Sequence, residues 1–171
     1  LQHPIALLAN ALGSPPPEVI EQCHAKGVKV AALAGRADHA ARHVEAGVDI
    51  LVAVGHEAGG HTGEITTMVL VPDIVDVAQG RPVLAAGGIG SGRQIAAALA
   101  LGADGAWMGS MWLTTSEYRL EPQQATGRSL VQDKLLAAES KDTVRSRVIS
   151  GKPARMLRTP WTEAWTAEGS P

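Results

Sequence analysis

Apolar and polar positions follow one another in blocks over the first 110 residues, and a single unit recurs. Each unit has a short apolar run, a glycine-rich turn and an Ala-rich amphipathic stretch. Runs that are apolar on both faces and alternate with helices are typical of a parallel sheet. The pattern predicts strands at Ile5–Ala9, Val28–Leu33, Ile50–Val54, Val83–Ala86 and Gly105–Met108, and helices near Pro16–Lys26, Ala37–Ala46, Thr67–Ala78 and Gly92–Leu101.

This alternation fits either an open doubly wound sheet or a barrel. The dinucleotide-binding open sheet needs G-x-G-x-x-G after its first strand, whereas this chain has Gly13-Ser14-Pro15-Pro16-Pro17 there. Its glycine loops instead follow the last three strands, and barrels recurrently bind phosphate after strands 7 and 8. We therefore expect an α/β fold of the (β/α)8 TIM-barrel type, with this chain covering about strands 4–8 as a partial barrel.

The pattern changes after about Glu121, which predicts a division of the chain. We expect residues 1–120 to form the C-terminal part of the barrel and residues 121–171 to form a helical or peripheral segment. A helix is predicted over Arg128–Glu139, and Gly151–Pro171 is expected to be a peripheral tail.

Composition narrows the function classes. Hydrophobic residues make up 45% of the 171 residues, but aromatics only 3%, so the core must be built from Ala, Val, Leu and Ile. The net charge of −2 gives no basic stripe for nucleic acid, and no apolar run is long enough to span a bilayer. Cys23 is the single cysteine, expected as a small buried hydrophobe. These features favour a cytoplasmic enzyme with a small-molecule substrate, and they leave a homodimer open.

Two neighbouring strand ends carry glycine turns suited to phosphate. One strand ends in Ala85-Ala86-Gly87-Gly88-Ile89-Gly90 and the next in Trp107-Met108-Gly109-Ser110. Glycine lets backbone N–H groups approach a phosphate closely, and the following helix adds its positive end. We therefore predict that these turns form a phosphate clamp.

A third glycine loop, residues 55–64, is the candidate for chemistry. Gly59 and Gly60 would let a flat ring approach the backbone, leaving His61 directed at the ring. Imidazole titrates near neutrality and can accept or donate a proton, so His61 is the predicted catalytic residue. Glu57 is expected to cap or brace its loop.

The other histidines do not predict a metal site. His56 and His61 have the spacing H-E-x-x-x-H with two glycines inside, which is neither a zinc motif nor helical. His39 and His43 are one helical turn apart and are expected to be a solvated pair. We predict no metal.

Taken in order, these motifs resemble the nitronate monooxygenase (2-nitropropane dioxygenase-like) family of FMN-dependent oxidoreductases. The resemblance rests on Glu57–His61, Ala85–Ile89, Ala97–Ala103 and Met108–Ser110. It implies an FMN-bound barrel that oxidises alkyl nitronates with O2 and uses His61 as the base. FMN contacts would come from Gly59, Gly60, Gly87, Gly88, Trp107, Met108, Gly109 and Ser110.

Two departures from the family pattern affect the activity more than the fold. Val54 stands where the family commonly has Gln, and Met111 follows Ser110 where the family has Arg. A close alternative is the flavin-dependent enoyl-acyl-carrier-protein reductase, which the run Gly60–Thr67 resembles and which implies NAD(P)H as electron donor. A non-catalytic fragment of such an enzyme is the third hypothesis.

Overall fold

The structure, a computed structural model, describes residues 3–118 and 127–166. Its chain forms two compact units. The first, which we call the barrel unit, consists of residues 1–58 and 63–107, and the second unit consists of residues 59–62 and 108–171. Most of the second unit thus follows Trp107 in the chain, and a short piece of it, residues 59–62, comes from the third glycine loop.

The barrel unit contains a five-stranded parallel sheet whose strands are neighbours in chain order. A doubly wound sheet reverses its strand order, whereas successive barrel strands add on one side only. The order seen here is that of a barrel arc, as predicted. The strands are β1 (Leu7–Asn10), β2 (Lys29–Ala34), β3 (Ile50–Val54), β5 (Val83–Ala86) and β6 (Gly105–Ala106).

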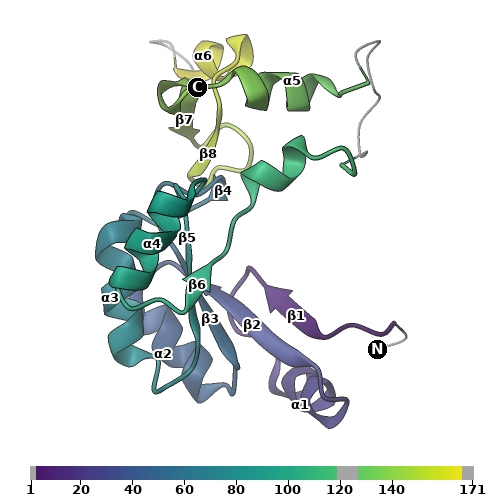
Figure 1. Ribbon diagram of the computed structural model, residues 1–171, viewed down its shortest axis with the longest axis vertical. Helices are drawn as coiled ribbons and strands as arrows, with labels where there is room; N and C mark the ends of the chain where they lie inside the picture. The colour runs from purple at the N-terminus through teal and green to yellow at the C-terminus, as the bar shows by residue number, and fades with distance from the viewer. Residues whose placement is uncertain (1–2, 119–126, 167–171) are drawn as a thin grey trace. The chain divides into compact units, whose positions relative to one another are not determined.

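Helices connect these strands and cover one face of the sheet (Figure 1). They are α1 (Pro17–Ala25), α2 (Ala37–Glu45), α3 (Thr67–Val77) and α4 (Gly92–Ala100). The main core lies between helices and sheet and consists of small and branched side chains, as the composition predicted. Cys23 is part of this core with 1% of its surface exposed, which confirms its expected role as a small hydrophobe.

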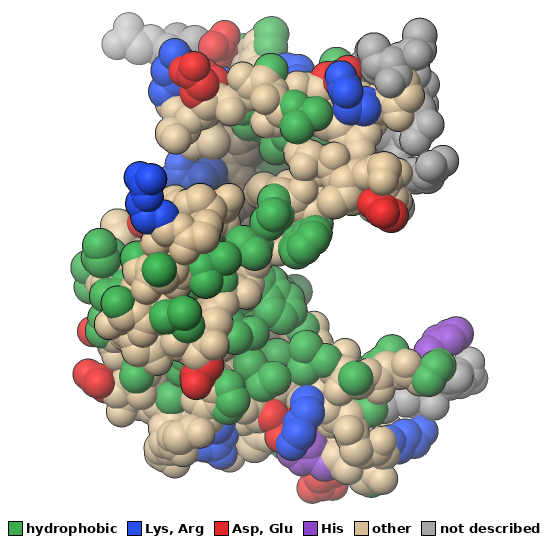
Figure 2. All heavy atoms as spheres, viewed as in Figure 1, with side chains coloured by type: hydrophobic (Ala, Val, Ile, Leu, Met, Phe, Trp, Pro, Cys, Tyr) green, Lys and Arg blue, Asp and Glu red, His purple; other side chains and the backbone are tan. Residues whose placement is uncertain are grey.

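The other face of the sheet is also apolar, because successive side chains of a strand point to opposite faces. Ala31, Val52 and Ala86 are buried there, and Leu33 and Leu84 pack against them in part. Apolar side chains gather over β2 and β3 in Figure 2. This second apolar face is the interior of a (β/α)8 barrel.

Three helices of the barrel unit end in the same way, at a glycine with positive φ. Gly27, Gly47 and Gly102 have φ of 69°, 90° and 97°. In each case the glycine N–H and the next N–H donate to carbonyls of the last helical turn, for example Val48 N to His43 O at 3.0 Å. This is the Schellman arrangement, and it explains why Gly precedes each of these strands.

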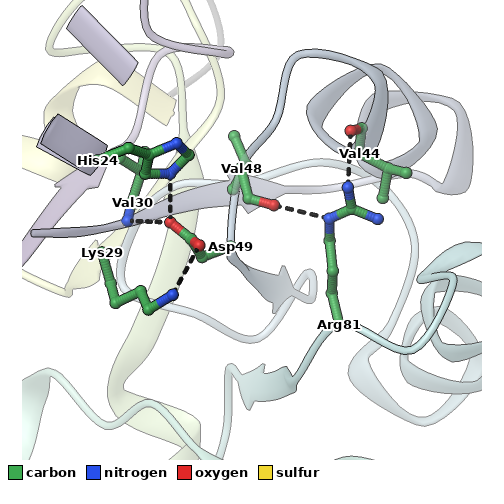
Figure 3. Close-up of polar contacts among 7 residues, drawn as sticks. All are labelled: His24, Lys29, Val30, Val44, Val48, Asp49 and Arg81. Carbon is green, nitrogen blue, oxygen red and sulfur yellow. Dashed lines mark hydrogen bonds and ion pairs between the residues drawn. The ribbon is translucent and has the colours of Figure 1, made fainter. Parts of the chain in front are cut away.

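Side chains tie the strand beginnings together (Figure 3). Asp49, just before β3, accepts hydrogen bonds from the Val30 N–H at 2.8 Å, from His24 Nε2 at 2.8 Å and from Lys29 Nζ at 3.1 Å. Arg81 donates to the carbonyls of Val48 and Val44, the latter in the last turn of α2. Asp104, just before β6, repeats the Asp49 role by accepting from the Val83 N–H at 2.8 Å.

The second unit is built around a three-stranded antiparallel sheet in the order β4-β8-β7. Within Gly151–Pro171, the stretch expected as a peripheral tail, the structure places the central strand of this sheet, β8, and a short helix. Short period-two strands are weak in sequence, so the pattern did not show them. The elements are β4 (Gly60–His61), α5 (Leu130–Ala137), β7 (Thr143–Ser146), β8 (Ala154–Leu157) and α6 (Pro160–Thr166), with 3-10 turns at Ser110–Thr114 and Ser140–Asp142.

Helix α5 confirms the helix predicted over Arg128–Glu139. Its start is fixed by a capping box, in which Gln132 N donates to Ser129 Oγ and Ser129 N donates to Gln132 Oε1. Within the described residues, no helix of the chain is both long and apolar enough to cross a membrane.

Candidate active site

In the barrel unit, the loops after β3 and β5 meet around the side chain of Thr67. Its Oγ1 lies 2.9 Å from Glu57 Oε2 and 3.0 Å from the Gly87 carbonyl. Gly55 and Gly87 must be glycine here, because a Cβ at either would lie 2.1 Å or 2.8 Å from Thr67 Oγ1. Thr67 therefore fixes the carboxyl ends of these two neighbouring strands to each other.

Glu57 caps helix α3, which confirms its expected role. The helix has no side-chain cap from Thr66, and Glu57 Oε2 instead accepts from the Thr67 N–H at 2.9 Å. Burial alone would raise the pKa of Glu57, but the hydrogen bonds from Thr67 outweigh it and hold the pKa below its ordinary value. The carboxylate is thus ionised at neutral pH and placed at the positive end of α3.

The predicted phosphate glycines Gly87 and Gly88 form the turn after β5, with φ of 112° and 69°. Their need for glycine arises within the chain, because a Cβ at Gly88 would lie 3.1 Å from Glu57 Cβ. The two glycines therefore explain how the turn packs on the β3 loop.

Three further residues, at the start of α4, were not predicted as site residues from the sequence. Ser91, Arg93 and Gln94 line a surface pocket. Gly90 and Gly92 lie beside it with ordinary φ, and no atom of the described residues lies within 4 Å of a Cβ at either position, so packing within this part of the chain does not require glycine there. The N–H groups of Gly92 and Arg93 find no acceptor among the described residues. The phrase Gly90-Ser91-Gly92-Arg93 at a predicted helix start was the signal for this pocket.

Trp107 lies at the end of β6, where its N–H donates to the Ala85 carbonyl at 2.8 Å. Its side chain packs against the second apolar face, with Ala86 and Val52. The predicted residues Gly87, Gly88 and Trp107 thus all lie at the carboxyl ends of β5 and β6, which are adjacent strands.

The remaining predicted residues belong to the second unit. A Cβ built on Gly59 would lie 3.4 Å from Ser110 Oγ, so the structure brings these two predicted residues together. Gly60 begins β4 with φ of 81°. Met108 and Gly109 lead into the 3-10 turn that starts at Ser110.

His61, the predicted catalytic residue, is the second residue of β4 and is exposed. Its Nε2 lies 2.6 Å from Ser150 Oγ, in the loop between β7 and β8. The next residue, Thr62, is held by Arg145, whose Nη2 donates to its carbonyl at 3.1 Å and whose Nε donates to its Oγ1 at 3.2 Å. Ser150 and Arg145 were not identified from the sequence, because they are more than 80 residues away and no motif marks them.

The expectation that His39 and His43 form a solvated pair is wrong for His43, which is 3% exposed. Its Nε2 lies 3.1 Å from the Leu33 carbonyl, so it carries the proton there, and Nδ1 accepts from Ser14 Oγ at 2.7 Å. Burial lowers the pKa of His43 and outweighs the hydrogen bond to Leu33. A neutral imidazole thus anchors the loop after β1. Within residues 3–118 and 127–166, no three His, Cys, Asp or Glu side chains form a group that could hold a metal ion.

A sequence model of the nitronate monooxygenase family matches residues 1–170. The chain belongs to this family. The match confirms the resemblance drawn from the glycine loops and His61.

Relatives within and near the nitronate monooxygenase family share the sequence along most of this chain. A protein of Mycobacterium tuberculosis named as a monooxygenase is 62% identical over 169 residues, which cover 99% of this chain and 43% of that protein. The chain thus spans less than half the length of this relative.

Two solved structures have the same fold. FabK from Thermotoga maritima superposes with a TM-score of 0.80 and 35% identity over 92% of this chain and 48% of FabK. A nitroalkane oxidase from Streptomyces ansochromogenes gives 0.78 and 33% over 95% of this chain and 48% of that enzyme. Half-coverage by both structures agrees with the partial barrel predicted from the strand count.

Proposed function

We propose that this chain is part of an FMN-dependent oxidoreductase that oxidises alkyl nitronates with O2. The proposal rests above all on the family membership together with glycine turns at adjacent strand ends, β5 and β6, which is where barrels bind phosphate. Its expected site residues are Gly59, Gly60, Gly87, Gly88, Trp107, Met108, Gly109, Ser110 and His61.

The start of α4 fits the phosphate of FMN. Gly90 and Gly92 leave space that no described residue occupies, and the first-turn N–H groups of α4 point a partial positive charge outward. Arg93, which lines the same pocket, adds a full charge. We propose that this pocket receives the phosphate, while Gly87 and Gly88 shape the turn that leads to it.

FMN, when bound, would supply electron transfer from the nitronate to oxygen. The chain's own contribution is to take a proton and to hold the substrate. His61 would remove the proton from the carbon next to a nitro group, a task that an imidazole performs as a general base. Glu57 is committed to capping α3 and is not available as the base.

The experiment compares His61→Ala with the unchanged protein. We expect the variant to keep FMN, seen as absorbance near 450 nm, but to turn over a nitroalkane about 100-fold more slowly, as loss of a general base predicts. Unchanged turnover would remove His61 from the mechanism. A colourless protein that does not respond to added FMN would instead support the non-catalytic fragment.

A second candidate is reduction of an enoyl thioester with NAD(P)H as the electron donor. The stretch from residue 143 to 162 carries five basic residues and no Asp or Glu: Arg145, Arg147, Lys152, Arg155 and Arg158. Such a stretch suits a substrate with a phosphate or an acidic carrier. Flavin reduced anaerobically by NAD(P)H favours this candidate, and flavin reduced by a nitronate favours the monooxygenase.

A further inference from the structure

The backbone of His61 is held on several sides within the second unit. His61 pairs with Ala154 in the β4-β8 ladder. The following residue, Thr62, donates its N–H to the Pro153 carbonyl and receives two hydrogen bonds from Arg145. The remaining freedom of His61 is rotation of an exposed ring about its two side-chain torsions.

Ser150 stands in a loop that is equally well fixed. The loop closes on itself, since Gly151 N donates to the Arg147 carbonyl at 2.8 Å and Arg147 Nη1 donates to the Gly151 carbonyl at 3.1 Å. Gly151 has φ of 72°, a conformation that favours glycine. The hydroxyl of Ser150 is thus presented from a closed turn to His61 Nε2 at 2.6 Å.

We propose that Ser150 is a positioning residue that accepts a hydrogen bond from His61 Nε2–H and so leaves the Nδ1 lone pair as the proton acceptor. This proposal rests on the proposed function of His61. Nδ1 of His61 makes no hydrogen bond within the part of the chain that the structure describes, so it is the nitrogen open to a substrate. In a neutral imidazole one ring nitrogen carries a proton and the other accepts one. The hydrogen bond made by one nitrogen decides which of the two carries the proton.

The geometry gives a balanced proton-transfer step. The C–H bond beside the nitro group breaks, its proton forms the Nδ1–H bond of His61, and the electron pair moves onto the nitro group to give the nitronate. His61 becomes an imidazolium, and its Nε2–H bond to Ser150 Oγ becomes charge-assisted and therefore stronger. Ser150 thus stabilises the product of proton transfer more than the starting state.

The first test reads the imidazole directly and needs no activity. Ring ¹⁵N chemical shifts of His61, assigned by their loss in His61→Gln, report which nitrogen carries the proton. We expect the Nε2–H form to dominate in the unchanged protein and a mixture of both forms in Ser150→Ala. A dominant Nδ1–H form, or the same mixture in both proteins, overturns the proposal.

The second test separates positioning from general structural damage. In the FMN-loaded protein, Ser150→Ala should lower kcat for a neutral nitroalkane about tenfold, the rate equivalent of one hydrogen bond, with KM nearly unchanged. Turnover of a preformed nitronate, which has no proton to lose, should stay the same. Ser150→Thr should restore kcat.

The matched control is Ser146→Ala on the same hairpin, where the hydroxyl accepts from the Val148 N–H. It should leave both substrates unaffected, and an equal loss in Ser146→Ala would overturn the proposal. Should the unchanged protein turn over neither substrate, the proposed function fails, while the ¹⁵N measurement still decides the role of Ser150.

Discussion

The two ends of the parallel sheet in the barrel unit are built on different principles. At the amino ends, Asp49, Asp104 and Arg81 each satisfy backbone groups of a neighbouring element. At the carboxyl ends, glycine turns dominate, and Gly90 and Gly92 leave space that none of the described residues fills. At the amino ends, side chains of the chain itself thus satisfy backbone groups, whereas the carboxyl ends keep space in which a ligand would bind.

The carboxyl end is itself divided into a packed inner part and an open outer part. Gly55 and Gly87 lie against Thr67 with no room for a methyl group, whereas Gly92 has nothing within 4 Å of a built Cβ. A glycine count therefore does not measure ligand-binding capacity. The packed glycines hold the two loops together, and only the open ones leave room for a phosphate.

The largest effect is expected where the packed part is broken. In Gly55→Ala the new Cβ would lie 2.5 Å from Thr67 N and 2.6 Å from Thr67 Cα, and backbone cannot move aside as a flexible side chain can. We expect the free energy of unfolding to fall by about 3 kcal/mol, the upper range for overpacking. The measurement is the urea midpoint. Gly92→Ala is the matched change in the open part and should leave the midpoint unchanged. Equal losses in both variants would show that the distinction between packed and open glycines is wrong.

The next effect tests the closed end. Asp49→Ala leaves the Val30 N–H without its acceptor, and an unsatisfied buried N–H costs about 2 kcal/mol. Asp38→Ala is the comparison, because Asp38 pairs with the exposed Arg36 and Arg42, and exposed ion pairs contribute little. The urea midpoint should fall clearly for Asp49→Ala and hardly at all for Asp38→Ala. If both midpoints fall alike, the amino end owes its stability to general charge balance rather than to Asp49.

Elements whose sequence pattern is local could be predicted from the sequence. The strands Ile50–Val54 and Val83–Ala86 were predicted with the bounds that the structure has, because each is a dense apolar run between glycine turns. The sequential strand order followed from repetition of one unit. Local pattern suffices where each element forms from its own residues.

Contacts between distant residues could not be predicted in this way. Ser150 reaches His61 only because β8 pairs with β4, and a two-residue strand carries no periodicity. His43 was expected in solvent because its helix face looked polar, yet Ser14 and Leu33 supply partners that make its burial favourable. Both errors concern polar side chains whose partners are far away in the sequence.

The smallest expected effect is the change of stability with pH, to which His43 and Asp49 contribute in different pH ranges. Burial lowers the folded-state pKa of His43 at the carboxyl side, while the unfolded chain takes up a proton near pH 6.5. The unfolded state therefore binds more protons below about pH 6.5, so stability is complete above that value and falls as the pH drops towards the folded-state pKa. Asp49, whose pKa is held low by the Val30 N–H and its cationic partners despite burial, loses its contribution only in the more acidic range of carboxylates. Urea midpoints at pH 7.5 and 5.5 should thus differ by less than the effect of Asp49→Ala.

His43→Gln, which can keep both hydrogen bonds without titrating, should remove the difference. A difference that persists in His43→Gln would assign the pH dependence to other groups and leave His43 with an anchoring role alone.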